Sequence, residues 1–126
     1  MLVLVDSSCW VEALRPNGDA AVRSTVDTWL AEGSIAVCAP VFAEVLRGVR
    51  KPDVRRVRRT LESLHYLETH EADWRQVIRL SRALADVAQH VPLVDLVVAV
   101  VATGTEPSWP TATATSRRSP RSCRFA

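Results

Sequence analysis

The apolar positions of the first 102 residues follow two patterns, one typical of buried strands and one typical of helices. The stretch "LVLVD" at residues 2–6 is a continuous apolar run closed by an acid, which predicts a strand buried on both faces. "SIAVCAP" at residues 34–40 predicts a second strand, and "HYLET" at residues 65–69 is the candidate for a third. Helical patterns separate these runs, so the alternation predicts an α/β domain with a central parallel sheet.

Six segments carry the three- and four-residue apolar spacing of amphipathic helices. The first is short, because Ser7 or Ser8 is expected to cap it and the turn signal "RPNG" ends it. Pro40 and Pro92 are expected to open two others, since proline fits the first turn of a helix. The remaining expected helices span residues 19–32, 53–64 and 71–89.

The large side chains on these stripes are expected to pack inward. Trp10, Trp29 and Trp74 are read as core or dimer-interface residues rather than as platforms for nucleic-acid bases. In the helix over residues 71–89, the expected inward set is Trp74, Val77, Ile78 and Leu84.

Composition divides the chain near residue 102. Residues 1–102 carry 12 Lys or Arg and 13 Asp or Glu, whereas residues 103–126 carry four Arg and one Glu. The net charge of +2 therefore comes from the tail, and it says little about the partners of the domain. We expect a single compact domain over residues 1–102, and a disordered, low-complexity tail over residues 103–126.

The sequence also bears on the surroundings of the protein. Its apolar runs fall short of the roughly 18 residues that a membrane span needs, and the first residues are read as a strand rather than a signal peptide. The three cysteines have no metal-site spacing, and the three histidines have none either. We therefore expect a protein of the reducing cytosol that does not interact with membranes.

Three acids stand alone in apolar segments: Asp6 after the first strand, Glu44 in "PVFAEVLRG", and Asp95 in "VPLVDLVVAVVA". A buried ionised carboxylate costs several kcal/mol unless another group compensates its charge. The carboxyl ends of parallel strands meet at one edge, where the three acids can share a divalent cation such as Mg²⁺ or Mn²⁺. Such an ion can activate water for cleavage of a phosphodiester bond.

Each acid also has an ordinary structural interpretation. Asp6 can be a helix cap, Glu44 can pair with Arg47, and Asp95 can cap its helix or face solvent. For any single acid this interpretation is favoured, and for all three together the two interpretations are about equal.

The blocks "VDSSCWVEALR", "PVFAEVLRGVR" and "VPLVDLVVAVVA" resemble, in order and separation, the three conserved blocks of PIN-domain ribonucleases. The resemblance covers residues 1–102 and is greatest to toxins of the virulence-associated protein C (VapC) type. It implies a three-layer α/β/α fold and a Mg²⁺- or Mn²⁺-dependent endoribonuclease, the toxin of a toxin–antitoxin system. It also implies a homodimer and a cognate antitoxin that blocks the acidic site.

The resemblance assigns roles to five residues. Asp6, Glu44 and Asp95 match the catalytic, metal-binding acids of the family. Ser8 matches the position whose hydroxyl supports the first acid. Arg47 matches a basic residue beside the site, although a surface or ion-pairing role is the more frequent one for such an arginine.

The tail departs from the family pattern, which has a fourth acid in a "D-x-D-F"-like stretch followed by a last strand. The tail has no acid after Glu106 and no apolar run suited to a buried strand. Its "TATAT" can be written with GC-rich codons that read Arg-Asp-Arg-Asp in another frame. We therefore interpret the tail as a frameshift product, with the slip near residues 102–104.

Two further alternatives remain open. The basic run at residues 50–59 is either a contact for the RNA backbone or a solvated helix face, of which the second is favoured. The missing fourth acid favours a catalytically impaired relative that only binds its antitoxin, whereas the three retained acids favour the enzyme.

Overall fold

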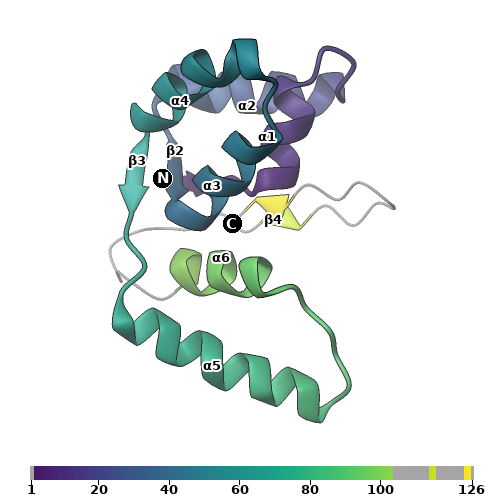
Figure 1. Cartoon of the computed structure of the whole chain (residues 1–126), viewed down its shortest axis with the longest axis vertical. Coiled ribbons are helices and arrows are strands. Elements are labelled where there is room, and N and C mark those ends of the chain that lie inside the picture. Colours follow the sequence, from purple (N-terminus) through teal and green to yellow (C-terminus); the bar gives the residue numbers. More distant parts are fainter. Residues whose placement is uncertain (1, 104–113, 116–123, 126) are drawn as a thin grey trace.

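The computed structural model describes residues 2–103, 114–115 and 124–125 (Figure 1). Its central sheet is parallel and has the order β1-β2-β3, which confirms the predicted α/β class. The strands are β1 (Val3–Leu4), β2 (Ile35–Cys38) and β3 (His65–Leu67). Leu4 lies opposite Ala36, and Val37 lies opposite Tyr66. All three candidate strands are therefore present, and their carboxyl ends share one edge of the sheet.

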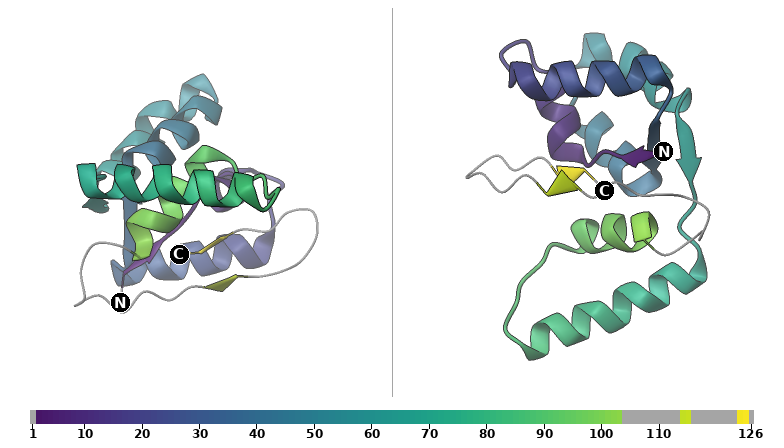
Figure 2. Two further views of the ribbon diagram at one scale, coloured as in Figure 1. Left: turned by 90° about the horizontal axis from the view of Figure 1, so that it is seen from below. Right: turned by 180° about the vertical axis from the view of Figure 1, so that it is seen from behind.

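Helices pack around this sheet and against one another. They are α1 (Ser7–Leu14), α2 (Ala20–Glu32), α3 (Ala39–Gly48), α4 (Val54–Glu62), α5 (Glu71–Asp86) and α6 (Leu93–Thr103), with a 3₁₀ turn at Lys51–Asp53. Figures 1 and 2 show α3 and α2 on opposite sides of the strands. Helix α3 packs against α1, α4 and α6, and α5 packs against α6. Helix α3 thus contacts α1 and α4 as well as α6, at the edge of the sheet where the acids were expected.

The capping residues explain where α1 and α2 begin and where α2 ends, and one predicted cap is wrong. Neither Ser7 nor Ser8 caps α1, because the Asp6 carboxylate accepts the backbone N–H of Cys9 instead. Asp19 caps α2 in the same way, and Gly33 ends that helix with a left-handed φ of 67°.

The core consists mainly of β-branched residues from the sheet and from the inner faces of α3 and α6. Trp10 is fully buried, as expected, and Trp29 packs against the core. The buried free cysteines Cys9 and Cys38 act as small apolar residues there. The buried side chains of the sheet are Val3, Leu4, Ile35, Ala36, Val37 and Cys38.

Helix α5 corrects the prediction for its inward face. Trp74 is 43 % exposed and Ile78 is 67 % exposed, so neither belongs to the core. The buried or partly buried positions are Asp73, Gln76, Val77, Leu80 and Leu84, a narrow stripe at helical spacing. Trp74 and Ile78 each lie one residue beyond this stripe, which turns them about 100° away from it. Because α5 rests mainly on α6, only one such stripe is covered.

The C-terminal segment forms β4 (Ala114–Thr115) and β5 (Arg124–Phe125), an antiparallel pair. We expected no strand there, and in the described part of the chain these two do not join the parallel sheet. The predicted disorder concerns mainly residues 104–113 and 116–123, which lie outside the described residues. Helices long and apolar enough for a membrane span are absent from the described residues.

Candidate functional site

Asp6 lies where β1 ends and α1 begins, and it is only 8 % exposed. Its Oδ1 accepts hydrogen bonds from the Ser8 hydroxyl at 2.7 Å and from the backbone N–H of Cys9 at 3.1 Å. These two donors stabilise a nearly buried carboxylate. Ser8 therefore contacts the acid that the resemblance assigned to it, and Asp6 is a helix cap as well.

Glu44 lies in the middle of α3, and its side chain is 30 % exposed. Its Oε2 accepts a hydrogen bond from the Ser7 hydroxyl at 2.5 Å, and its Oε1 lies 3.9 Å from the Arg47 guanidinium. The ordinary interpretation, a pair between Glu44 and Arg47, is thus present. Glu44 also contacts Ser7, which directly follows Asp6 in the first turn of α1.

Sequence reasoning missed Ser7. The signal was available in the doubled serine of "VDSSCW", since two hydroxyls directly after a lone acid can serve two different acceptors. The partner of Ser7 is 37 residues away, so only the packing of α1 on α3 reveals it.

Asp95 lies in the first turn of α6 and is half-buried. An acid is favourable there because the unpaired N–H groups of a helix start carry partial positive charge. The next three residues, Leu96, Val97 and Val98, are buried, and α6 packs against α3, the helix that carries Glu44. The Ser7 contact thus brings Glu44 to the helix turn that Asp6 caps, and Asp95 is on α6, which packs against the helix that carries Glu44.

The donor set suits a hard divalent cation in its chemistry, because all three side chains offer carboxylate oxygens. However, in the described residues no three Asp, Glu, His or Cys side chains are grouped closely enough to hold a metal ion. The shared metal site of Asp6, Glu44 and Asp95 therefore stays a prediction. The tail, where the family has its fourth acid, contains no Asp or Glu after Glu106.

Cys38 ends β2 close to this edge of the sheet, but its chemistry argues against a nucleophile. Burial raises the pKa of its thiol, and hydrogen bonds from backbone groups oppose that effect only in part. A protonated, fully buried thiol is a poor nucleophile at neutral pH.

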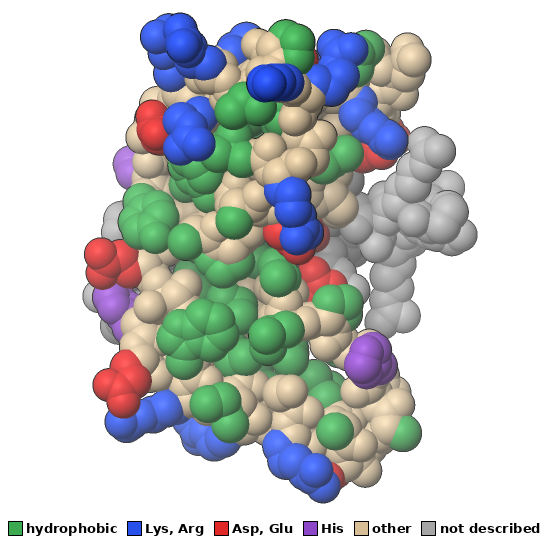
Figure 3. All heavy atoms as spheres, viewed as in Figure 1, with side chains coloured by type: hydrophobic (Ala, Val, Ile, Leu, Met, Phe, Trp, Pro, Cys, Tyr) green, Lys and Arg blue, Asp and Glu red, His purple; other side chains and the backbone are tan. Residues whose placement is uncertain are grey.

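The face that carries α3 and α6 shows side chains of all kinds (Figure 3). Acidic side chains lie near its middle and along one edge, basic side chains gather at its upper end and along its lower end, and apolar side chains are widespread between them. In the described part of the chain as a whole, the exposed large apolar residues include Tyr66, Trp74 and Ile78. Beside α4, a pocket of about 530 Å³ has apolar walls from Val11, Leu14, Val45, Val49 and Val57. Arg15, Arg50, Arg56 and Asp53 also line it, and Asp53 pairs with Arg50 and Arg56.

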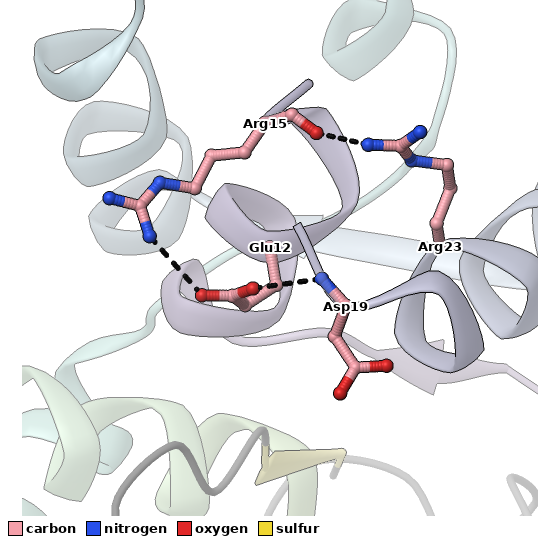
Figure 4. Close-up of polar contacts among 4 residues, drawn as sticks. All are labelled: Glu12, Arg15, Asp19 and Arg23. Atoms are coloured by element: carbon pink, nitrogen blue, oxygen red, sulfur yellow. Dashed lines mark hydrogen bonds and ion pairs between the residues drawn. The ribbon is translucent and has the colours of Figure 1, made fainter. Parts of the chain in front are cut away.

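Polar contacts among Glu12, Arg15, Asp19 and Arg23 fix the C-terminal end of α1 (Figure 4). The buried Glu12 carboxylate accepts the backbone N–H of Asp19 at 3.0 Å and lies 3.4 Å from the Arg15 guanidinium. Arg23 of α2 donates to the backbone carbonyls of Ala13, Arg15 and Pro16. The chain runs so close to itself here that a Cβ on Gly18 would lie 1.8 Å from the Glu12 carbonyl oxygen. These contacts hold the C-terminal end of α1 against α2, whereas Asp6 lies at the N-terminal end of α1.

The chain matches the family model of the PIN domain over residues 3–106. None of the curated proteins matches the chain.

Proposed function

Since the chain belongs to the PIN domain family, whose members are generally metal-dependent nucleases, we propose that it is an endoribonuclease and the toxin of a type II toxin–antitoxin pair. The observation that carries the proposal is the hydrogen bond between Ser7 and Glu44, because it brings a second lone acid to the helix turn that Asp6 caps. The substrate would be cytoplasmic RNA.

Asp6, Glu44 and Asp95 would hold Mg²⁺ or Mn²⁺, which supplies an activated water and stabilises the leaving oxygen. Ser8 would keep Asp6 oriented through its 2.7 Å hydrogen bond. Arg47, whose side chain is 81 % exposed, would contact a phosphate of the RNA when the substrate approaches. Cleavage would leave a 5′-phosphate and a 3′-hydroxyl without a covalent enzyme intermediate.

The direct test incubates the purified protein with total RNA in Mg²⁺, with and without EDTA. We expect cleavage that EDTA stops, and fragments that a 5′-phosphate-dependent exonuclease degrades. Cleavage that continues in EDTA would contradict a metal-dependent reaction.

The partner would be an antitoxin with two complementary features. A basic side chain of the antitoxin would enter the acidic site. An acidic amphipathic segment would suit the pocket near α4, whose walls are largely apolar and whose three arginines outnumber its single acid, Asp53. A small gene directly upstream should encode this protein. Absence of such a gene, together with harmless expression in cells, would contradict the toxin role.

The exposed apolar residues of α5 support a homodimer, because such patches on a small domain are typical of interfaces. We expect light scattering to give the mass of a dimer for the parent and of a monomer for Ile78→Glu. Val87→Glu is the control, since Val87 is equally exposed and lies beyond the end of α5. A dimer that survives Ile78→Glu would place the interface elsewhere.

A second candidate function is an impaired relative that binds its antitoxin without cleaving RNA. The absence of a grouped metal site among the described residues, and of a tail acid after Glu106, favours it. Antitoxin binding without any nuclease activity in Mg²⁺ or Mn²⁺ would identify this case.

A further inference from the structure

The hydroxyl of Ser7 has a partner that helix capping does not explain. Asp6 already caps α1, so the Ser7 side chain is not needed for that purpose. It instead donates to Glu44 Oε2, at 2.5 Å, across the packing of α1 on α3. We propose that Ser7 is a positioning residue that holds the Glu44 carboxylate for binding of the divalent cation, an inference that rests on the proposed function.

Glu44 needs such a contact because its other partner does little to hold the carboxylate in one orientation. The Arg47 guanidinium is 3.9 Å from Oε1 and lies largely in solvent, where an ion pair one helical turn away contributes little. A glutamate has three side-chain torsions, and without Ser7 its carboxylate would be free to follow Arg47 outward. A short hydrogen bond from a hydroxyl to a carboxylate is of the strong kind, and it selects one orientation.

Ser7 and Ser8 each donate a hydrogen bond to a different acid. Ser8 donates to Asp6 Oδ1, whereas Ser7 donates to Glu44 Oε2. Because both serines lie in the first turn of α1, the backbone of that turn fixes one carboxylate relative to the other. Ser7 thereby sets the position of Glu44 relative to Asp6, as a residue behind a metal ligand typically does.

The test measures Mn²⁺ affinity by calorimetry for two substitutions of equal shape, Ser7→Val and Ser7→Thr. Loss of the hydroxyl in Ser7→Val should weaken Mn²⁺ binding about tenfold, the effect typical of a residue that orients a metal ligand. Ser7→Thr keeps the hydroxyl and should bind Mn²⁺ like the parent. Ser34→Ala is the matched control, because the Ser34 hydroxyl donates to the exposed Glu32, away from the site.

A double-mutant cycle with Glu44→Gln separates positioning from a general effect on the fold. If Ser7 acts through Glu44, Ser7→Val should weaken Mn²⁺ binding no further once Glu44 is Gln. Equal affinity of Ser7→Val and the parent, while Asp6→Asn binds weakly, would overturn this inference and leave the proposed function intact. Absence of Mn²⁺ binding by the parent itself would overturn the proposed metal site, and this inference with it.

Discussion

The Asp6 carboxylate follows a strand, caps a helix and is a proposed metal ligand at the same time. Its burial is tolerable because two donors already satisfy Oδ1. Asn and Asp are equally good helix caps, so Asp6→Asn removes the charge and spares the cap. The ordinary and the catalytic interpretations of this acid therefore do not exclude one another.

Single residues also hold α1 in place, and Gly18 shows how tightly. We expect Gly18→Ala to lower the free energy of unfolding by about 1–3 kcal/mol, because the new Cβ meets the Glu12 carbonyl. Gly48→Ala is the control, since a Cβ there meets nothing within 4 Å, and it should raise that free energy by up to about 1 kcal/mol. Urea melts measure both. A harmless Gly18→Ala would contradict the close approach between this loop and α1.

At the scale of elements, strands and helix spans could be predicted because apolar runs and cap residues are local signals. The contacts of α5 could not be predicted, since periodicity locates an apolar face but does not show how much of that face the neighbouring helix covers. Trp74 and Ile78 were misplaced for that reason. The metal-site hypothesis likewise named Asp6 and Glu44 from their apolar surroundings, whereas the Ser7 contact depends on helix packing that no local pattern encodes.

The narrow buried stripe of α5 makes a matched prediction for two valines. Val77 is 2 % exposed, and Val77→Ala should cost about 2 kcal/mol of stability by leaving a cavity against the core. Val87 is 65 % exposed, and Val87→Ala should stay within about 0.5 kcal/mol of the parent. Denaturant unfolding of both variants tests this, and equal costs would show that α5 packs differently.

At the scale of the whole molecule, the match to the PIN domain ends at residue 106, close to where the helical pattern stops. The described residues add no fourth strand to the parallel sheet, so the outer edge of β1 has no strand partner among them. The change of reading frame near residues 102–104 stays a prediction. Sequence patterns suggested it there, because composition and periodicity alter together at that point.

The gene itself tests the frameshift interpretation. An alternative frame near codons 102–104 should encode a fourth acid followed by an apolar run. Restoring that frame by one base should raise both nuclease activity and the melting temperature, because it adds a metal-site acid and a strand. A gene whose other frames encode neither feature would end the interpretation.

The central claim is that Asp6 belongs to a metal-dependent nuclease site, and cleavage of RNA in Mg²⁺ by Asp6→Asn tests it most directly. Asp19→Asn is the matched control, since Asp19 also caps a helix through its carboxylate. We predict that Asp6→Asn loses cleavage by at least about 100-fold, as expected for a metal-site charge, while both variants stay folded. Asp19→Asn should cleave like the parent. Parent-like cleavage by a folded Asp6→Asn protein would contradict the account.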